Sequence, residues 1–171
     1  MAPRKVEVLP YDPAWKDAFS AICAEVESAV GDLILGIEHV GSTSVEGLPA
    51  KPIIDLDVVI ADDACFAALA EKMEQIGYYH EGNLGIPGRE AFGYEGKTHL
   101  MKHHLYVCVQ SAAELRRHIV FRDYLRAHPD AAAKYAAVKQ EAARLYPYDI
   151  DGYIRHKSGC IEDIYRLCGL L

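Results

Sequence analysis

The segment HVGSTSVEGLPAKPIIDLDVVI, residues 39–60, constrains the fold of this chain more than any other. Its second half is rich in β-branched residues and follows Pro52, so it predicts a strand over Ile53–Ile60 that begins just after the proline. In a strand, residues two apart point to the same face. Asp55 and Asp57 therefore lie side by side, while the apolar residues that alternate with them face a core.

Two neighbouring carboxylates on an otherwise apolar strand indicate chemistry. They repel each other and are costly to bury, and a hard cation such as Mg²⁺ removes that cost by using one or two carboxylates together with substrate phosphates. The turn at Gly41-Ser42 precedes the strand, and its backbone N–H groups and hydroxyl can hold a phosphate. These features predict metal-assisted phosphoryl or nucleotidyl chemistry. The ordinary alternatives are a solvated edge strand and a turn in which Ser42 or Ser44 caps a helix.

Composition narrows the class of protein. A length of 171 residues fits one domain over 1–171, and 51% hydrophobic with 25% charged residues is ordinary for a soluble globular protein. The net charge of −7 argues against broad nucleic-acid binding, which needs a basic surface, but leaves room for a local basic pocket. With no long apolar run and no signal-peptide pattern, we expect a cytoplasmic protein with no membrane partner. The sequence leaves the oligomeric state open.

Five cysteines, an odd number without a CxxC pair and mostly among apolar neighbours, predict that most are buried thiols rather than ligands of a zinc site.

The hydrophobic periodicity predicts mixed strands and helices followed by helices alone. We expect strands at 5–9, 33–40, 53–60, 78–81 and 98–109, a loop or hairpin around 89–94, and helices at 13–30, 62–76, 112–127, 130–145 and about 152–168. This order is typical of an α+β domain with a helical C-terminal half.

Several blocks of the sequence resemble the GrpB-like family, a branch of the nucleotidyltransferase superfamily. IEHVGSTSVEGLPAKPIIDLDVVI is similar to the family pattern EHxGST-x-V-x-GL-x-AKPIID. FRDYLRAHPDAAAKYAAVKQEAA at 121–143, HHLYV at 103–107 and the spaced pair Tyr153 and Lys157 also match, so the resemblance covers nearly the whole chain.

The resemblance implies a nucleotidyltransferase-like small mixed β-sheet flanked by helices, with a GS turn that holds a nucleoside triphosphate. It implies that Gly41 and Ser42, with Thr43 and Ser44, form the phosphate turn. It also implies that an Asp-x-Asp pair, here Asp55 and Asp57, binds two Mg²⁺ ions.

The chain departs from the superfamily at the third carboxylate that usually completes such a site. The strand where this residue should lie carries His104 and Tyr106 and no Asp or Glu. His104 is a candidate ligand or base. Imidazole is a poor ligand for Mg²⁺ compared with Mn²⁺ or Zn²⁺, so Mn²⁺ is a possible replacement.

Four further cations are candidates for phosphate binding. Lys51 precedes the aspartate strand, and Lys157 follows Tyr153 by one helical turn. Arg122 and Arg126 are four residues apart and share a helix face, where they form either a cationic wall or a surface paired with acids such as Asp123. Each lysine has the simpler alternative of pointing to solvent.

His39, at the end of a strand, is expected either to hydrogen-bond the turn or to reach a ligand.

The leading interpretation is an Mg²⁺-dependent, nucleotidyltransferase-like enzyme that binds a nucleoside triphosphate and an unknown acceptor. Asp55 and Asp57 hold metal, and His104 takes the proton of the acceptor's attacking hydroxyl or amine. Two alternatives stay open: a non-catalytic module that binds a nucleotide or phosphometabolite, and a metal-dependent hydrolase that uses His104 with the two aspartates.

Overall fold

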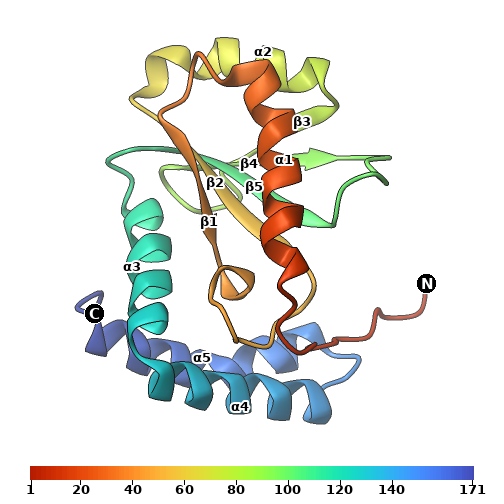
Figure 1. Ribbon diagram of the computed structural model, residues 1–171, viewed down its shortest axis with the longest axis vertical. Coiled ribbons are helices and arrows are strands. Elements are labelled where there is room, and N and C mark those ends of the chain that lie inside the picture. The colour runs from red at the N-terminus through yellow and green to blue at the C-terminus, as the bar shows by residue number, and fades with distance from the viewer.

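The computed structural model describes all 171 residues and contains one five-stranded sheet with helices on both sides (Figure 1). The strands are β1 (Gly36–Val40), β2 (Ile54–Ile60), β3 (Tyr78–Gly82), β4 (Arg89–Tyr94) and β5 (His103–Val109). The α-helices are α1 (Ala14–Val30), α2 (Phe66–Gln75), α3 (Ala113–Ala127), α4 (Pro129–Leu145) and α5 (Ile150–Leu167), and two short 3₁₀ turns, η1 and η2, cover Ser42–Ser44 and Asp63–Cys65.

The sheet is mixed, with strand order β1-β2-β5-β4-β3. Only β2 and β5 run parallel, and the other neighbouring strands are antiparallel. The β2–β5 register places Asp55 opposite His104 and Asp57 opposite Tyr106. Because paired residues in a sheet share a face, all four side chains project from the same side.

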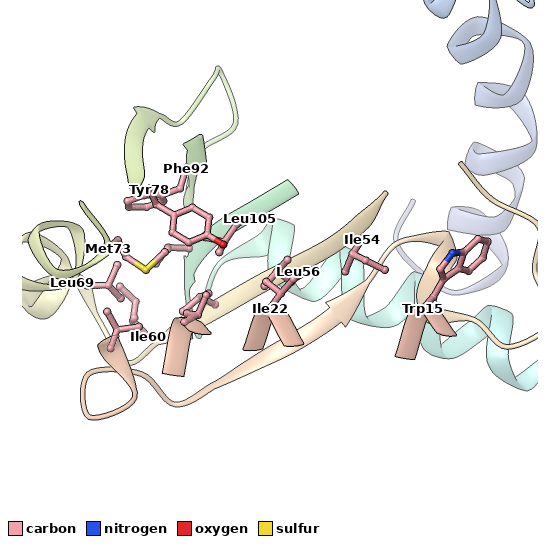
Figure 2. Packing of buried hydrophobic residues seen from close by; sticks show 14 of the residues in the cluster. Trp15, Ile22, Ile54, Leu56, Ile60, Leu69, Met73, Tyr78, Phe92 and Leu105 are labelled. Atoms are coloured by element: carbon pink, nitrogen blue, oxygen red, sulfur yellow. The ribbon is translucent and has the colours of Figure 1, made fainter. Parts of the chain in front are cut away.

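The opposite side of the sheet carries the main hydrophobic core. Residues of β2 and β5 that alternate with the polar ones pack there against α1 and α2, together with Tyr78 and Phe92 of the outer strands. Figure 2 shows Ile54, Leu56 and Ile60 of β2 in this layer. The alternation along β2 thus separates a fully apolar face from a polar one, as the sequence predicts.

The polar face is covered only in part, by the C-terminal helices. The start of α3 packs on one end of this face through Ala112 and Leu115, which contact Val59 and Cys108. Helices α4 and α5 pack against each other beneath the sheet (Figure 1). A second cluster ties them to α3 and to the segment after η1, through Val45, Leu48, Leu125, Tyr135 and Ile164. The other end of the polar face therefore opens toward α4 and α5.

The predicted α+β class, with a small mixed sheet and a helical C-terminal half, is confirmed. Most element bounds agree within a few residues, but residues 5–9 do not form a strand. Their backbone pairs only locally, through a bridge between Leu9 and Ala50 and a bond from the Val6 N–H to the Pro147 carbonyl. These partners lie in irregular segments, so no extended ladder forms.

Two other predictions need correction. The strand predicted from residue 98 begins only at His103, because a turn closes from the Leu100 N–H to the Lys97 carbonyl. The cysteines are free thiols, but only Cys108 is buried, and the other four are half-buried.

None of the helices combines the length and the apolar character that crossing a lipid bilayer requires.

Candidate active site

The two aspartates of β2 lie in different environments on the polar face of the sheet. Asp55 is one-third exposed and its Oδ1 lies 3.0 Å from Nδ1 of His104. Asp57 is fully buried, and its Oδ2 lies 2.6 Å from Nδ1 of His118 on α3. Nε2 of His118 lies 3.1 Å from the Glu114 carboxylate. His118 therefore sits between two carboxylates.

These contacts have opposing effects on ionisation. Burial raises the pKa of Asp57, and the hydrogen bond from His118 opposes that rise only in part. Burial would lower the pKa of His118, but the hydrogen bond and the charge of Asp57, together with Glu114, raise it overall. The other carboxylate oxygen of Asp57, Oδ1, is buried without a hydrogen-bond partner. A buried carboxylate oxygen without a partner is costly, and this cost is offset if a ligand reaches it.

The turn after β1 is fitted to Asp55. Gly41 has a φ of +72°, and a Cβ at this position would collide with the Asp55 carboxylate. Both the backbone conformation and the close approach therefore require glycine. Within the turn, Ser44 donates its hydroxyl proton to the Gly41 carbonyl.

His39 holds the other side of the turn. Its Nε2 lies 2.9 Å from the Thr43 hydroxyl, and its ring stacks on Phe19. Burial, together with the positive charge of Arg126, lowers the pKa of His39 to about 4, so its ring is neutral at physiological pH. Of the two roles expected for His39, the structure shows the hydrogen bond to the turn.

A pocket of about 150 Å³ opens between this turn, the polar face of the sheet and the C-terminal helices. Its lining includes Ser42 and Thr43 of the turn, Asp55 and His104 of the sheet, and three lysines, Lys51, Lys139 and Lys157. The turn, one aspartate, His104 and two of the predicted lysines therefore meet in one place. Asp57 lies deeper and does not line the pocket.

The three lysines lack carboxylate partners, since none forms an ion pair within 4 Å. Lys51 and Lys157 lie over the Tyr153 ring, at 5.4 and 4.8 Å from its centroid, and Lys139 lies 4.9 Å from the centroid of Tyr135. Lys139 is 2% exposed. Such rings supply a weak attraction in place of a counter-ion.

Burial lowers the pKa of all three lysines. Burial, reinforced by the charges of the other two lysines, lowers the pKa of Lys139 to about 7. Burial and Lys51 lower the pKa of Lys157 to about 8, and burial also lowers the pKa of Lys51. An anion in the pocket would favour the protonated form of each lysine.

Arg122 and Arg126 of α3 lie behind the turn and do not line this pocket. Arg122 is nearly buried and donates to Glu38, to Asp123 and to the His39 carbonyl. Arg126 donates twice to the Ser44 carbonyl, at 3.0 and 2.7 Å. The predicted pairing with Asp123 is present. Their assignment to phosphate binding stays a prediction that this geometry does not favour, because their donors are already used to hold the turn.

The sequence resemblance implies Mg²⁺ at the paired aspartates, and the residues present fit such an ion in a limited way. Asp55 and Asp57 share a face, and the unpartnered Asp57 Oδ1 is the kind of oxygen that Mg²⁺ takes. No group of three or more His, Cys, Asp or Glu side chains is arranged to hold a metal. The protein would therefore supply two carboxylates, and substrate phosphates and water the remaining ligands, which is the usual pattern for Mg²⁺.

Sequence reasoning missed Lys139 and His118, although helical spacing marks both. Lys139 falls on the same stripe of α4 as the buried Tyr135 and Ala142. His118 stands between Leu115 and Arg122 on the buried side of α3. A basic residue on the buried stripe of a helix is unusual and was the available signal.

Comparison with known proteins places the chain in a family. The family described as GrpB protein matches residues 5–167. UPF0157 protein PA4798 of Pseudomonas aeruginosa is 38% identical over 172 residues, which cover 96% of this chain and 67% of that protein. UPF0157 protein YqkA of Bacillus subtilis is 36% identical over 159 residues, which cover 93% of this chain but 46% of YqkA, so the chain spans about half the length of that relative.

A solved structure agrees with these sequence matches. The crystal structure of the conserved protein GrpB from Enterococcus faecalis superposes with a TM-score of 0.83 at 32% identity, and the match covers 95% of this chain and 96% of that chain. The resemblance that the sequence motifs indicate is thereby confirmed: the chain belongs to the GrpB family.

Proposed function

We propose that this protein is an Mg²⁺-dependent enzyme that binds a nucleoside triphosphate and transfers its nucleotidyl group to an acceptor. The observation that carries the proposal is the pocket itself. It gathers three lysines without carboxylate partners next to Asp55 and a serine turn. Cations that are half-buried or buried without counter-ions need an anion, and a chain of phosphates supplies several charges in a small volume.

Each group in the pocket has a role in this proposal. Lys51, Lys139 and Lys157 bind phosphate oxygens, and the Ser42 hydroxyl donates to one of them. Asp55, which lines the pocket, and Asp57, which lies deeper on the same face of the sheet, would hold Mg²⁺, and the ion would offset negative charge on the phosphates. The lysines and the turn fix the triphosphate, so most of the contribution of this chain is positioning.

His104 is the proposed base. Asp55 accepts a hydrogen bond from Nδ1 of His104, which leaves Nε2 with its lone pair free. The His104 side chain is 46% exposed and lines the pocket, so an acceptor can reach it. The hydrogen-bonded Asp55 thus sets the tautomer that is able to take a proton.

The test is the thermal stability of the protein with ATP, CTP, GTP or UTP, each with and without Mg²⁺ or Mn²⁺. A ligand at about 100 times its dissociation constant adds about 2.7 kcal/mol to the free energy of unfolding. We expect a metal-dependent increase for at least one nucleotide in the wild type and none in Asp55→Asn. Asp63→Asn, an exposed aspartate on the η2 turn, is the matched control and keeps the increase.

The outcome separates this proposal from its alternatives. Binding without turnover over hydroxyl and amine acceptors would leave a non-catalytic nucleotide module. Release of phosphate without an acceptor, with Mn²⁺ or Zn²⁺ preferred to Mg²⁺, would make the protein a metal-dependent hydrolase instead. No increase with any nucleotide would refute triphosphate binding.

A further inference from the structure

A second hollow continues from the phosphate pocket. Its volume is about 790 Å³, against about 150 Å³ for the pocket, and the two share Lys51, Ile53 and His104 in their linings. We call this larger hollow the entrance groove. The proposed base therefore stands at the junction of a small pocket and a wider groove.

One wall of the entrance groove is the N-terminal segment, and it is held in place. The Val6 side chain is buried against Ala142 and Tyr153, and its N–H donates to the Pro147 carbonyl at 2.8 Å. Arg4 and Lys5 come just before this anchor and line the groove. Packing of Val6 therefore fixes the position of the two basic residues that precede it.

The entrance groove is positively charged in a protein whose net charge is −7. Arg4, Lys5, Lys51 and Lys102 line it, against one acid, Glu7. Glu7 approaches Lys5 at 3.8 Å, whereas Arg4 and Lys102 form no ion pair. A concentration of unpaired cations on an otherwise acidic protein favours an anionic ligand.

The groove also has an apolar side. Tyr148 and Ile150, at the turn between α4 and α5, line it and are 59% and 44% exposed. Large exposed apolar side chains beside basic ones suit an organic molecule with a ring or a carbon chain and a charged end. An uncharged nucleoside would leave the basic residues unused.

We propose that the entrance groove binds the acceptor, and that this acceptor is an organic phosphate ester with a free hydroxyl group. Arg4 and Lys102 bind its phosphate, and Tyr148 and Ile150 contact its carbon skeleton. The role of the ester as acceptor rests on the proposed function, but its binding in the entrance groove does not. The hydroxyl oxygen attacks the α-phosphorus of the triphosphate, the bond from that phosphorus to the bridging oxygen breaks, pyrophosphate leaves with the electron pair, and the hydroxyl proton passes to Nε2 of His104.

The test uses ribose 5-phosphate as the probe and ribose as its uncharged counterpart, with binding followed by shifts of backbone amide NMR signals. We expect ribose 5-phosphate to shift the amides of Lys5, Lys102 and Tyr148, and ribose to bind at least about tenfold more weakly. Arg4→Ala/Lys102→Ala should weaken the ester about tenfold or more. Arg116→Ala/Lys134→Ala removes the same charge from exposed positions away from the groove and should leave binding unchanged.

Three results would overturn the groove assignment. The first is no binding of ribose 5-phosphate at about 10 mM, roughly ten times a dissociation constant of 1 mM. The others are equal binding of ribose and equal weakening by the two double variants.

Lys157→Met separates this proposal from the proposed function. This variant alters the phosphate pocket alone, so it should reduce ATP binding and leave ribose 5-phosphate binding intact. If ATP fails to bind the wild type while the ester binds through Arg4 and Lys102, the proposed function is wrong and the groove site stands. If Lys157→Met instead abolishes ester binding, the ester lies in the pocket and the groove assignment is wrong.

Discussion

Two groups of basic residues surround the serine turn, and they differ in what their charges meet. Arg122 and Arg126 of α3 have their donors taken by Glu38, Asp123 and backbone carbonyls. The pocket lysines, Lys51, Lys139 and Lys157, lie over aromatic rings and have no carboxylate within 4 Å, and the charge of Asp55 reaches them only from farther away. Charge alone therefore does not identify a binding residue. The arginines complete the structure of the turn, whereas the lysines leave charge without a counter-ion.

The difference also predicts opposite effects on stability. Removing a side chain that satisfies partly buried acceptors destabilises a protein, whereas removing a buried cation without a partner relieves a cost. Substitutions in the two groups should therefore change the free energy of unfolding in opposite directions.

The largest effect is expected for Arg122→Met. The side chain is nearly buried and bonds Glu38 on β1 and the His39 carbonyl. Loss of these hydrogen bonds should lower the free energy of unfolding by about 2–3 kcal/mol. The loss should be smaller than for a fully buried ion pair, because Glu38 is partly exposed. Urea denaturation measures the change. Arg116→Met, at an exposed position of the same helix, should stay within about 0.5 kcal/mol of the wild type. An equal loss in both variants would contradict the role assigned to Arg122.

Lys139→Met should have the opposite sign and raise the free energy of unfolding by about 1–2 kcal/mol at pH 7. The methionine keeps most of the buried stem and removes the charge that burial disfavours. The same denaturation experiment applies, with Lys134→Met on α4 as the exposed control. If Lys139→Met instead lowers the free energy of unfolding, Lys139 stabilises the free protein and does not differ from the arginines in this respect.

The pH dependence of stability sharpens this prediction. Lys139 has a pKa of about 7 in the folded protein, against an ordinary value near 10.5. Between these values the unfolded chain binds a proton that the folded chain does not, so this group makes stability rise as pH increases from about 7 toward 10. Lys139→Met should rise less steeply than Lys134→Met between pH 7 and 9.5. Parallel curves for the two variants would show that Lys139 titrates normally.

The sequence predicts the sheet side of the site well. The alternation in β2 fixes which side chains face the core, so Asp55 and Asp57 could be placed on one face without a structure. The same reasoning places His104 and Tyr106 on one face of β5, but only the register of β5 on β2 shows that His104 lies opposite Asp55. Periodicity is a local property, and it carries over directly to the folded protein.

The helical side of the site is harder to predict. Whether Arg122 reaches Glu38, or Lys139 lines the pocket, depends on how α3 and α4 pack on distant parts of the chain. The spacing of Arg122 and Arg126 is compatible with both a cationic wall and a structural tie, and only tertiary contacts decide between them. A sequence also gives no direct sign of which cations lack partners.

An effect confined to ligand binding, without a change in the free energy of unfolding of comparable size, is expected for Lys157→Met. One charge-assisted hydrogen bond to phosphate contributes about 1.5–3 kcal/mol, so ATP should bind about tenfold to one-hundredfold more weakly. Calorimetric titration with ATP and Mg²⁺ measures the change. Lys134→Met should bind ATP as the wild type does. Unchanged affinity in Lys157→Met would remove this lysine from the phosphate site.

The smallest effect is expected for Arg126→Lys. This variant tests whether Arg126 acts through its hydrogen bonds to the turn rather than through its charge. Arg126 reaches the Ser44 carbonyl with two N–H groups, Nε and Nη2, which a single ammonium cannot reproduce at the same geometry. The substitution keeps the charge, so an electrostatic role in attracting phosphate would survive it. We expect a loss of about 0.5–1 kcal/mol in unfolding free energy with ATP affinity within about twofold of the wild type, after correction for the unfolded fraction. A large loss of ATP affinity with an unchanged free energy of unfolding would instead show that Arg126 contacts the ligand. The arginines and the pocket lysines would then share one role.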